Sequence, residues 1–594
     1  MGKLFTAILN DRLYNHLVGN DLLNKWQAGF LPDHRTSDQT FIIKSLTQKY
    51  INHNKKRLYA CFVDFRKAFD LVWKEGLFYK LLKLGIGGKF YHTLKSMYNS
   101  SKVRIKTSEG LSHSMKTENG VRQGDSISPL LFNIFINDIP RLLFNEKSKP
   151  PLLDKESVPA LLYADDLIIL SKTAEGLQNN LNLLHDYCNK WRLEINLAKT
   201  NFMIMGKGKP QTLTFSYGDR LLIHKTSSYK YLGTIINSNG TFSQARTDLK
   251  QKGLKALFSI WKSISLGKSP PLNLSSKLFD TMVKPIALYN SDIWGAEVPS
   301  PIQSYILNND IKNEKKYLKF INECAYEQLH LKFCKMLLGL KRHTSNIASR
   351  AEIGRFPLFI EVQINIIKYW LRLISLPENR LIVDALNSNI RLHENGTYSW
   401  ISMVKYILES TGMQHIWINR QTDNKNKILK TLKCNLQKNY VNLFLKSMHD
   451  DELNMPNGNK LRTYRTFKKN HIKEEYLTLI RNRDIRSSVS KFRLSSHNLM
   501  IEKGRHTKTD LSKRTCDKCD SNQLEDEKHS LMYCPKYKAQ RTEIFSLMKE
   551  NCPFWNTISS QDQFITLMSM KYITVETGKF IHSIILDHSN MADT

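Results

Sequence analysis

Two adjacent acids interrupt an apolar run in the stretch Ala160-Leu-Leu-Tyr-Ala-Asp-Asp-Leu-Ile-Ile-Leu170. The apolar arms on both sides have the length of buried strands, so the stretch predicts a hairpin with Asp165 and Asp166 at its tip. Neighbouring carboxylates repel each other and lose hydration beside a buried sheet, and divalent cations between them would offset that cost. The alternative is an ordinary hairpin with a polar two-residue turn.

A second segment that carries carboxylates lies earlier in the chain. The run Leu58-Tyr-Ala-Cys-Phe-Val-Asp64 predicts a strand that ends in an acid, and Phe65-Arg-Lys-Ala-Phe-Asp70 then turns toward a helix. Mg²⁺ takes oxygen ligands and commonly keeps water and substrate phosphates in its shell. Two such ions, held by acids from separate strands, would activate a 3′-hydroxyl and stabilise a leaving pyrophosphate.

A polar loop precedes an apolar helix in Asn119-Gly-Val-Arg-Gln-Gly-Asp-Ser-Ile-Ser-Pro-Leu-Leu-Phe132. Ser128 is the expected N-cap, and Pro129 is the expected first helical residue. Gly120 and Gly124 would let the backbone approach a ligand closely. A plain capped helix of the core is the alternative, and it explains the apolar residues whatever the function.

Together these segments resemble palm motifs A, B and C of reverse transcriptases, in the variety found in non-LTR (LINE-type) retrotransposons. The resemblance covers residues 3 to about 236 and preserves the order of the family's motifs. The matching segments are Gln27–Phe30 with Arg35–Gln39 (early fingers), Phe62–Asp70 (motif A), Gly120–Gly124 (motif B), Tyr163–Asp166 (motif C), Leu193–Thr200 (motif D) and Tyr229–Gly233 (motif E).

The resemblance implies a role for each matching acid. Asp64 and Asp165 would ligate the two catalytic Mg²⁺ ions, for which Mn²⁺ could substitute, and Asp166 would be a supporting carboxylate. Phe69 stands where the family has the aromatic gate that excludes a 2′-hydroxyl on the incoming nucleotide. The expected substrates are therefore dNTPs.

Four further positions follow from the same resemblance. Gln123 and Gly124 would line the template and nucleotide pocket, and Arg35 would contact phosphate or template. Lys199 stands where motif D places a lysine that protonates pyrophosphate, although an isolated lysine is ordinarily a solvated surface charge. For Asp70 we expect a structural role, as the cap of a helix that begins around it.

The implied fold class is α+β: a right-hand polymerase with fingers and a palm built on an antiparallel sheet, a helical thumb, and a mainly helical C-terminal region with a small CCHC zinc knuckle. Apolar residues at helical spacing, as from Ile360 to Leu371, favour helices in the second half. The expected domains are 1–240 (fingers and palm), 241–345 (thumb), 346–510 (basic C-terminal segment), 511–540 (zinc knuckle) and 541–594 (helical tail).

The charge of the chain indicates a polyanionic partner. Its 594 residues carry 88 lysines and arginines against 54 aspartates and glutamates, a net +34. Residues 421–515 alone hold 22 basic and 9 acidic residues, a net +13. Such an excess opposes compaction and is typical of proteins that bind nucleic acid. We expect an RNA template and a DNA primer or target, with no membrane partner, because no apolar run approaches the ~18 residues that span a bilayer.

A cysteine cluster lies near the C-terminal end, at Cys516, Cys519, His529 and Cys534. Three thiolates and one imidazole form the closed tetrahedral set of a structural Zn²⁺ site, with no open position for hydrolysis. A disulfide and chance clustering are the alternatives. The set resembles the CCHC knuckle of LINE-type proteins, although the gap between Cys519 and His529 is longer than in retroviral knuckles.

Nine sparse cysteines favour a reducing intracellular compartment, and the resemblance implies a nuclear and cytoplasmic ribonucleoprotein. LINE-type elements pair the polymerase with an endonuclease. The chain opens inside the fingers motif at Lys3-Leu-Phe5, and residues 535–594 lack the acid pair of a restriction-like nuclease. We therefore expect an N-terminally truncated polymerase without its nuclease.

The sequence thus predicts an RNA-directed DNA polymerase, a nucleotidyltransferase that extends a primer 3′-hydroxyl with dNTPs. The main alternative is a catalytically inactive, truncated remnant that binds nucleic acid. An RNA-dependent RNA polymerase is disfavoured by Phe69. The sequence leaves the native template, the genomic target and the oligomeric state open.

Overall fold

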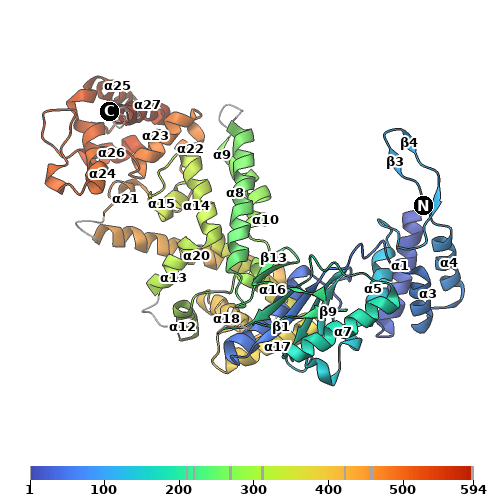
Figure 1. The fold of residues 1–594 in the computed structure, drawn as a ribbon. Helices are drawn as coiled ribbons and strands as arrows, with labels where there is room; N and C mark the ends of the chain where they lie inside the picture. The colour runs from blue at the N-terminus through green and yellow to red at the C-terminus, as the bar shows by residue number, and fades with distance from the viewer. Residues whose placement is uncertain are drawn as a thin grey trace.

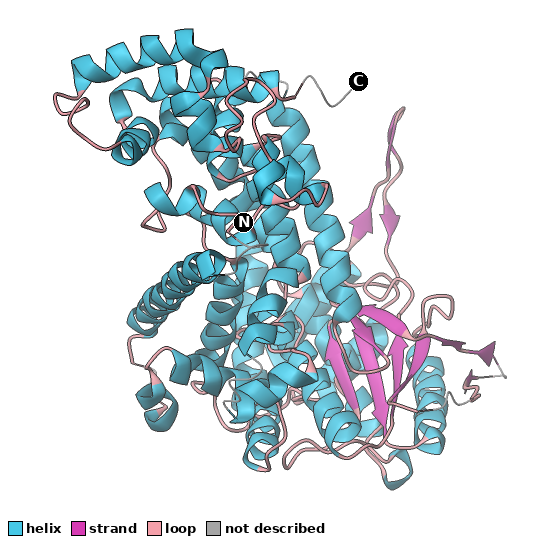
Figure 2. Cartoon of the chain, turned by 90° about the vertical axis from the view of Figure 1, so that its left-hand side faces the viewer, coloured by secondary structure: helices cyan, strands magenta, loops and turns pink. Residues whose placement is uncertain are grey.

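The structure is a computed structural model that describes residues 2–208, 212–218, 221–265, 271–308, 314–420, 423–453 and 459–589. It combines one main sheet with helices along the whole chain, so the expected mixed helix-and-sheet class is confirmed (Figure 1, Figure 2). No helix within those ranges is long and apolar enough to cross a membrane.

The main sheet has the strand order β11-β8-β1-β7-β6. Strand β1 lies at its centre and pairs antiparallel with both β7 and β8, whereas the edge strand β11 is parallel to β8. The strands expected around Asp64 and on both sides of Asp165 are thereby confirmed. Their bounds are β1 Leu58–Val63, β6 Ala160–Tyr163, β7 Asp166–Ser171, β8 Asn201–Met205 and β11 His224–Lys225.

The alternation of side chains along β1 divides the core into two layers. Phe62 belongs to the hydrophobic cluster that contains Phe41 of α2 (Thr36–Thr47), whereas Cys61 belongs to a second cluster, with Phe135 of α5 (Ser128–Ile136) and Leu181 of α7 (Ala174–Trp191). Because successive residues of a strand point to opposite faces, an entirely apolar strand is stable only when helices cover both sides. All six residues of β1 are buried accordingly.

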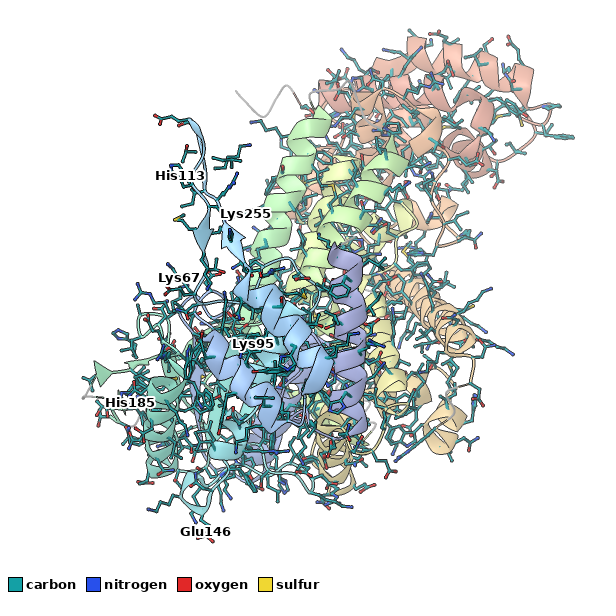
Figure 3. The ribbon with its side chains drawn as sticks, turned by 90° about the vertical axis from the view of Figure 1, so that its right-hand side faces the viewer. Lys67, Lys95, His113, Glu146, His185 and Lys255 are labelled. Carbon is teal, nitrogen blue, oxygen red and sulfur yellow. The ribbon has the colours of Figure 1, made fainter. Side chains whose placement is uncertain are left out.

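Helices beside the main sheet accompany a protruding two-stranded ribbon (Figure 1, Figure 3). The ribbon links α4 to the loop before α5 and is exposed along both strands. The bounds are α1 Gly2–Gly19, η1 Gln48–His53, α3 Lys74–Lys83, α4 Gly88–Asn99, β2 Lys102–Val103, β3 Lys106–Thr107, β4 Gly110–Leu111, β5 Met115–Lys116, α6 Ile139–Leu142 and η2 Glu146–Ser148.

Two small hairpins, β9-β10 and β12-β13, follow strand β8, and a long helix, α8, comes after them. Tyr229 of β12 stacks on Phe62 with ring centroids 4.2 Å apart, which fixes the motif E hairpin against the sheet. The bounds are β9 Ser216–Tyr217, β10 Leu221–Leu222, β12 Ser228–Tyr231, β13 Thr234–Asn237, α8 Ser243–Ser265, α9 Leu272–Leu278, η3 Phe279–Val283, α10 Lys284–Ala287, α11 Ser291–Trp294, α12 Ser300–Asn308, α13 Glu314–Glu323 and α14 Ala325–Leu338.

The remaining chain is helical, as the sequence periodicity predicts. Helices α16 and α17 pack against α2: the Tyr369 hydroxyl donates to Asp38 (2.8 Å), and the Asn389 amide donates to Ser45 (2.7 Å). The bounds are α15 Asn346–Glu352, α16 Leu358–Leu373, α17 Leu381–Glu394, α18 Trp400–Ser410, α19 Gln414–Asn419, α20 Lys425–Leu453, α21 Tyr464–Phe467, α22 Tyr476–Leu479, α23 Arg483–Arg493, α24 Met500–His506, η5 Leu511–Lys513, η6 His529–Tyr533, η7 Pro535–Tyr537, α25 Lys538–Asn551, α26 Ser560–Ser569, η8 Lys571–Ile573 and α27 Thr574–Asp587.

Candidate active site

Three carboxylates meet at one end of the main sheet because the strands that carry them are neighbours. Asp64 follows β1 directly, and β1 pairs with β7 so that Val63 lies opposite Leu167. Asp165 lies in the two-residue turn between β6 and β7, and Asp166 is the first residue of β7. The predicted hairpin is therefore confirmed, although its turn is Ala164–Asp165, one residue earlier than expected, and Asp166 pairs with Tyr163. The turn lies beside the end of the strand that precedes Asp64.

The electrostatics of this end of the sheet favour a cation. Burial, followed by the charges of Asp165 and Asp64, raises the pKa of Asp166 to about 6. Burial is also the main cause that raises the pKa of Asp165, and the charge of Asp64 adds to it. Neighbouring carboxylates disfavour one another's ionisation, and a bound cation would offset that repulsion. Their carboxylate oxygens are the donors that Mg²⁺ prefers, so these residues fit the expected metal ions.

Residues 26–30 form hydrogen bonds with the hairpin next to its turn. The side-chain oxygen of Gln27 accepts hydrogen bonds from the backbone N–H groups of Ala164 (3.1 Å) and Gly29 (2.7 Å). The backbone N–H of Ala28 donates to the carbonyl of Leu162 (2.9 Å). Sequence reasoning assigned Gln27 no role of its own, because its partner Ala164 lies 137 residues away and no local pattern reveals such a contact.

The motif D segment runs along Asp64 and brings Lys199 to the site. The backbone N–H of Asn196 donates to the carbonyl of Asp64 (2.8 Å), and the N–H of Asp64 donates to the Thr200 hydroxyl (3.2 Å). Lys199 Nζ lies 3.9 Å from Asp64 Oδ2, and its side chain is 69% exposed. Lys199 is therefore close to the carboxylates and still accessible from solvent.

Phe69 is held by two other aromatic rings. It stacks on Phe132 of α5 with centroids 4.5 Å apart, and the ring of Phe30 contacts it edge-on at 6.0 Å. The ring is half-buried, so one part of it still faces solvent. A side chain fixed in this way can act as a steric wall.

The motif B loop is tied to motif A through its backbone and one side chain. The N–H of Val121 donates to the carbonyl of Phe69 (2.9 Å), and the Gln123 amide donates to Asp70 Oδ1 (2.8 Å). Gln123 and Gly124 are both exposed, and Gly124 has a φ of +81°, which favours glycine. The loop thus lies next to Phe69 with its side-chain and backbone donors accessible.

Two expectations about helix caps are wrong. Asp70 caps no helix: it lies in a turn, and α3 begins later, at Lys74, after the N-cap Trp73. The Asp70 carboxylate is engaged instead by Gln123, which competes with any cap. Ser128 is the first residue of α5 rather than its N-cap, which is Ile127. Its hydroxyl lies 3.2 Å from that of Tyr98, a tertiary contact that the sequence does not show.

Arg35 precedes α2 and is exposed. Its backbone N–H donates to Asp38 Oδ2 (3.0 Å), and Asp38 also accepts from Arg372 of α16 (2.7 Å). This arrangement fixes the backbone at Arg35 and leaves its side chain at the surface.

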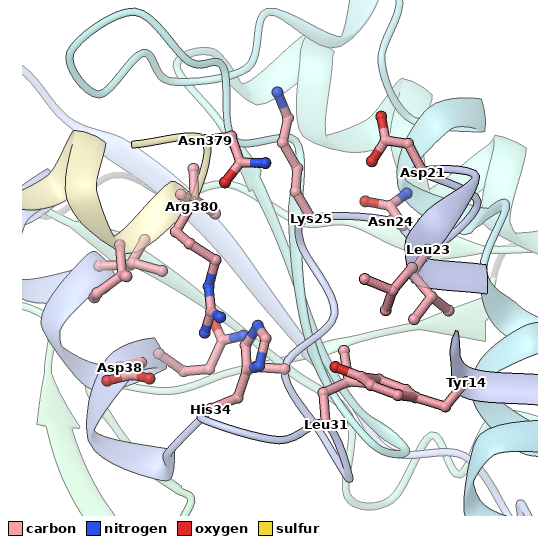
Figure 4. A pocket seen from close by; sticks show the side chains of 16 residues that line it. Tyr14, Asp21, Leu23, Asn24, Lys25, Leu31, His34, Asp38, Asn379 and Arg380 are labelled. Carbon is pink, nitrogen blue, oxygen red and sulfur yellow. The ribbon is translucent and has the colours of Figure 1, made fainter. Parts of the chain in front are cut away.

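A pocket lies beside the segment that precedes α2 (Figure 4). It has a volume of about 190 Å³, and His34, Asp38 and Arg380 are among the residues that line it. Burial lowers the pKa of His34, so the ring is neutral at pH 7. None of the three carboxylates lines this pocket, which is therefore separate from the candidate active site.

The four predicted zinc ligands converge. One ligand atom of each residue lies within 4.8 Å of all the others. The sulfur atoms of Cys516 and Cys534 are 3.9 Å apart, and Cys519 Sγ is 3.5 Å from His529 Nε2. The other ring nitrogen of His529 lies 3.0 Å from the Gln523 side-chain oxygen, which orients the imidazole as partners of metal-bound histidines do. The donor set therefore fits tetrahedral Zn²⁺.

Comparison with known proteins leads to the same assignment for the first part of the chain. Residues 1–236 match the family model described as "Reverse transcriptase (RNA-dependent DNA polymerase)". The polymerase from mobile element jockey of Drosophila funebris is 27% identical over 50% of this chain and 32% of its own length. The probable polymerase from transposon BS of Drosophila melanogaster is 26% identical over 59% of this chain and 39% of its own length.

A third relative, the Pol polyprotein from the type-1 retrotransposable element R2 of Nasonia vitripennis, is 28% identical over 40% of this chain and 23% of its own length. The chain thus spans well under half the length of these relatives. Among solved structures, telomerase from Candida albicans matches at 12% identity with a TM-score of 0.31, covering 66% of this chain and 59% of that one. A likeness of that size does not bear on the fold.

Proposed function

We propose that this chain, whose residues 1–236 form a reverse transcriptase domain of the non-LTR retrotransposon type, is an RNA-directed DNA polymerase that extends a primer 3′-hydroxyl with dNTPs. One observation carries the proposal: Asp64 and Asp165 come from neighbouring strands to one end of the sheet, with Asp166 beside them. Carboxylates in that arrangement are suited to holding two divalent cations.

The residues of the candidate active site have separate roles in metal binding and proton transfer. Asp64 and Asp165 hold the ions, and Asp166 adds a third negative charge next to them. The Mg²⁺ pair, when bound, supplies Lewis acidity for the attacking hydroxyl and for the leaving pyrophosphate. Lys199, 3.9 Å from Asp64 and exposed, donates a proton to the pyrophosphate as it leaves.

Phe69 and the residues around it select dNTPs over rNTPs. Its ring, fixed between Phe132 and Phe30, meets the 2′ position of the incoming sugar and rejects a hydroxyl there. Gln123 and Gly124 line the nucleotide and template pocket from the adjoining loop. Arg35 contacts a phosphate of the template from its exposed position before α2.

The cysteine cluster has a structural role in this proposal. Zn²⁺ held by Cys516, Cys519, His529 and Cys534 stabilises the small fold that begins after α24. Residues 241–345 act as the thumb, 346–510 as a basic helical segment, 511–540 as the knuckle and 541–594 as its helical tail. The partners are an RNA template and a DNA primer, and the setting is an intracellular ribonucleoprotein that reaches the nucleus.

Primer extension tests the proposal directly. The purified chain should extend oligo(dT) on poly(A) with dTTP and Mg²⁺, and Asp165→Asn should reduce the product to background. Asp186→Asn is the matched control, because that side chain is 80% exposed on α7, and it should leave extension unchanged. The absence of product with every primer, with Mg²⁺ or Mn²⁺, and over a range of salt would refute the polymerase and leave the inactive nucleic-acid-binding remnant.

A further inference from the structure

Three half-buried lysines meet where the end of α14 contacts the C-terminal region, and we call them the lysine cluster: Lys335, Lys341 and Lys460. Lys335 lies in the last turn of α14, Lys341 in the loop after it, and Lys460 between α20 and α21. Figure 1 shows α14 between α8 and the C-terminal helices. The cluster therefore joins the thumb side of the molecule to the region with the highest excess of positive charge.

Neutral oxygens, rather than carboxylates, hold these lysines in place. Lys335 Nζ donates to the carbonyl of Arg342 (2.6 Å) and to the Asn346 amide oxygen (2.7 Å). Lys341 Nζ donates to the carbonyl of His497 (3.3 Å) and to the Asn498 side-chain oxygen.

Lys460 Nζ donates to the carbonyl of His343 (3.2 Å). Within the described parts of the chain, none of the three ammonium groups forms an ion pair. Each is therefore fixed in direction without a carboxylate in direct contact.

The nearest acids are already occupied by arginines. Glu502 pairs with Arg462 (2.8 Å), and Asp451 pairs with Arg465 (3.2 Å). Burial, followed by the charge of Lys460, lowers the pKa of Lys335 to about 8. Ordered cations that repel one another cost folding energy, and a bound anion would offset that cost.

A basic groove continues from the cluster along the side of α14. It has a volume of about 730 Å³ and is lined by Lys250 of α8 and by Lys332, Lys335 and Arg342. Glu323 is the acid in its lining, and its side chain is 61% exposed and lies 3.9 Å from Lys319. Because Lys335 belongs to both features, groove and cluster form one continuous basic surface.

We propose that the lysine cluster and its groove bind the phosphodiester backbone of a single nucleic-acid strand outside the site of polymerisation. The inference rests on the proposed function, because a polymerase of this kind handles strands longer than its active site. Each of the three fixed ammonium groups can neutralise one phosphate, and each phosphate neutralised in this way releases condensed counterions. The shared chemistry is the phosphodiester, so RNA and DNA are both candidate sources.

The salt dependence of binding tests this site. The affinity for a 40-nucleotide single-stranded RNA, and for DNA of the same sequence, is measured from low to high salt without dNTPs. In the variant Lys335→Gln, Lys341→Gln, Lys460→Gln the slope of log K against log salt should fall by about 2, because each phosphate that no longer meets a lysine reduces it by ~0.7. A fall with RNA alone assigns the site to RNA, and an equal fall with both assigns it to the shared backbone.

A control with the same change in charge is available at three exposed lysines, Lys147 in η2 and Lys155 and Lys172 in loops. Their triple glutamine variant should keep the wild-type slope. Lysine-reactive labelling of the unmodified chain is a measurement that does not depend on folding of a variant: bound RNA should protect Lys335, Lys341 and Lys460. An unchanged slope, an equal fall in the control, or no protection would overturn the proposal. A failure of primer extension would not affect this result, because binding is measured without catalysis.

Discussion

The approach of Gly29 to the hairpin tip makes Gly29→Ala a severe test of the active-site geometry. A Cβ at Gly29 would lie 2.0 Å from the backbone nitrogen of Ala164 and 2.8 Å from the carbonyl carbon of Tyr163. Real Cβ contacts essentially never fall under 3.0 Å, so one of the two segments must move by about 1 Å. Both atoms belong to the backbone, which cannot rotate away as a side chain would.

That displacement has a calculable effect on catalysis. Asp165 follows Ala164 directly, so the carboxylate moves with the turn. A misplacement of about 1 Å costs on the order of 100-fold in rate, or roughly 2.7 kcal/mol of barrier. The overpacking itself should lower the free energy of unfolding by about 1–3 kcal/mol.

Primer extension measured as kcat/KM, together with Tm, checks both numbers. Gly19→Ala is the matched control, because a Cβ there has nothing within 4 Å, and its activity should equal that of the wild type. If Gly29→Ala kept full activity and the wild-type Tm, the close packing of the segment 26–30 against the hairpin tip would be refuted.

Three further predictions follow from the same structure. Burial and neighbouring charges raise the pKa of Asp166 in the folded chain to about 6, above its unfolded value. Ionisation of Asp166 therefore lowers the stability of the metal-free fold as pH rises from about 4 to 6. Asp166→Asn should raise Tm at pH 8 and have little effect at pH 4, and an equal effect at both pH values would contradict the raised pKa. Phe69→Ala should increase incorporation of rNTPs relative to dNTPs in primer extension, whereas unchanged sugar selectivity would count against the gate. Metal analysis should find about one Zn²⁺ per chain and a clear loss of metal in Cys519→Ser; a wild-type value well below one would refute the site.

Several strands of the main sheet could be predicted from the sequence because they depend on local patterns. The apolar strands before Asp64 and on both sides of Asp165 follow from their composition, and the structure has them where expected. The zinc ligands followed from residue type and spacing, and the structure brings them together. Both the strands and the zinc ligands are recognised from residue types and spacings within one short stretch of sequence.

The failures concern residues whose partners are distant or whose environment is tertiary. Asp70 was expected to cap a helix, but Gln123, from a loop 53 residues away, takes its carboxylate. Gln27 had no predicted role of its own, because its side chain holds a turn formed much later in the chain. Local propensity says nothing about such pairs.

The sequence by itself determined the carboxylates, their strands, the zinc ligands and the excess of positive charge, because each is a matter of residue type and short-range periodicity. Only the tertiary structure decided which strands are neighbours, and so placed Asp64 beside the turn that carries Asp165. It also decided that Lys335, Lys341 and Lys460 meet with neutral oxygens as their partners. Those outcomes depend on how segments about a hundred residues or more apart pack together. Burial and charge then depend on which residues are neighbours in space, and the local sequence does not show this.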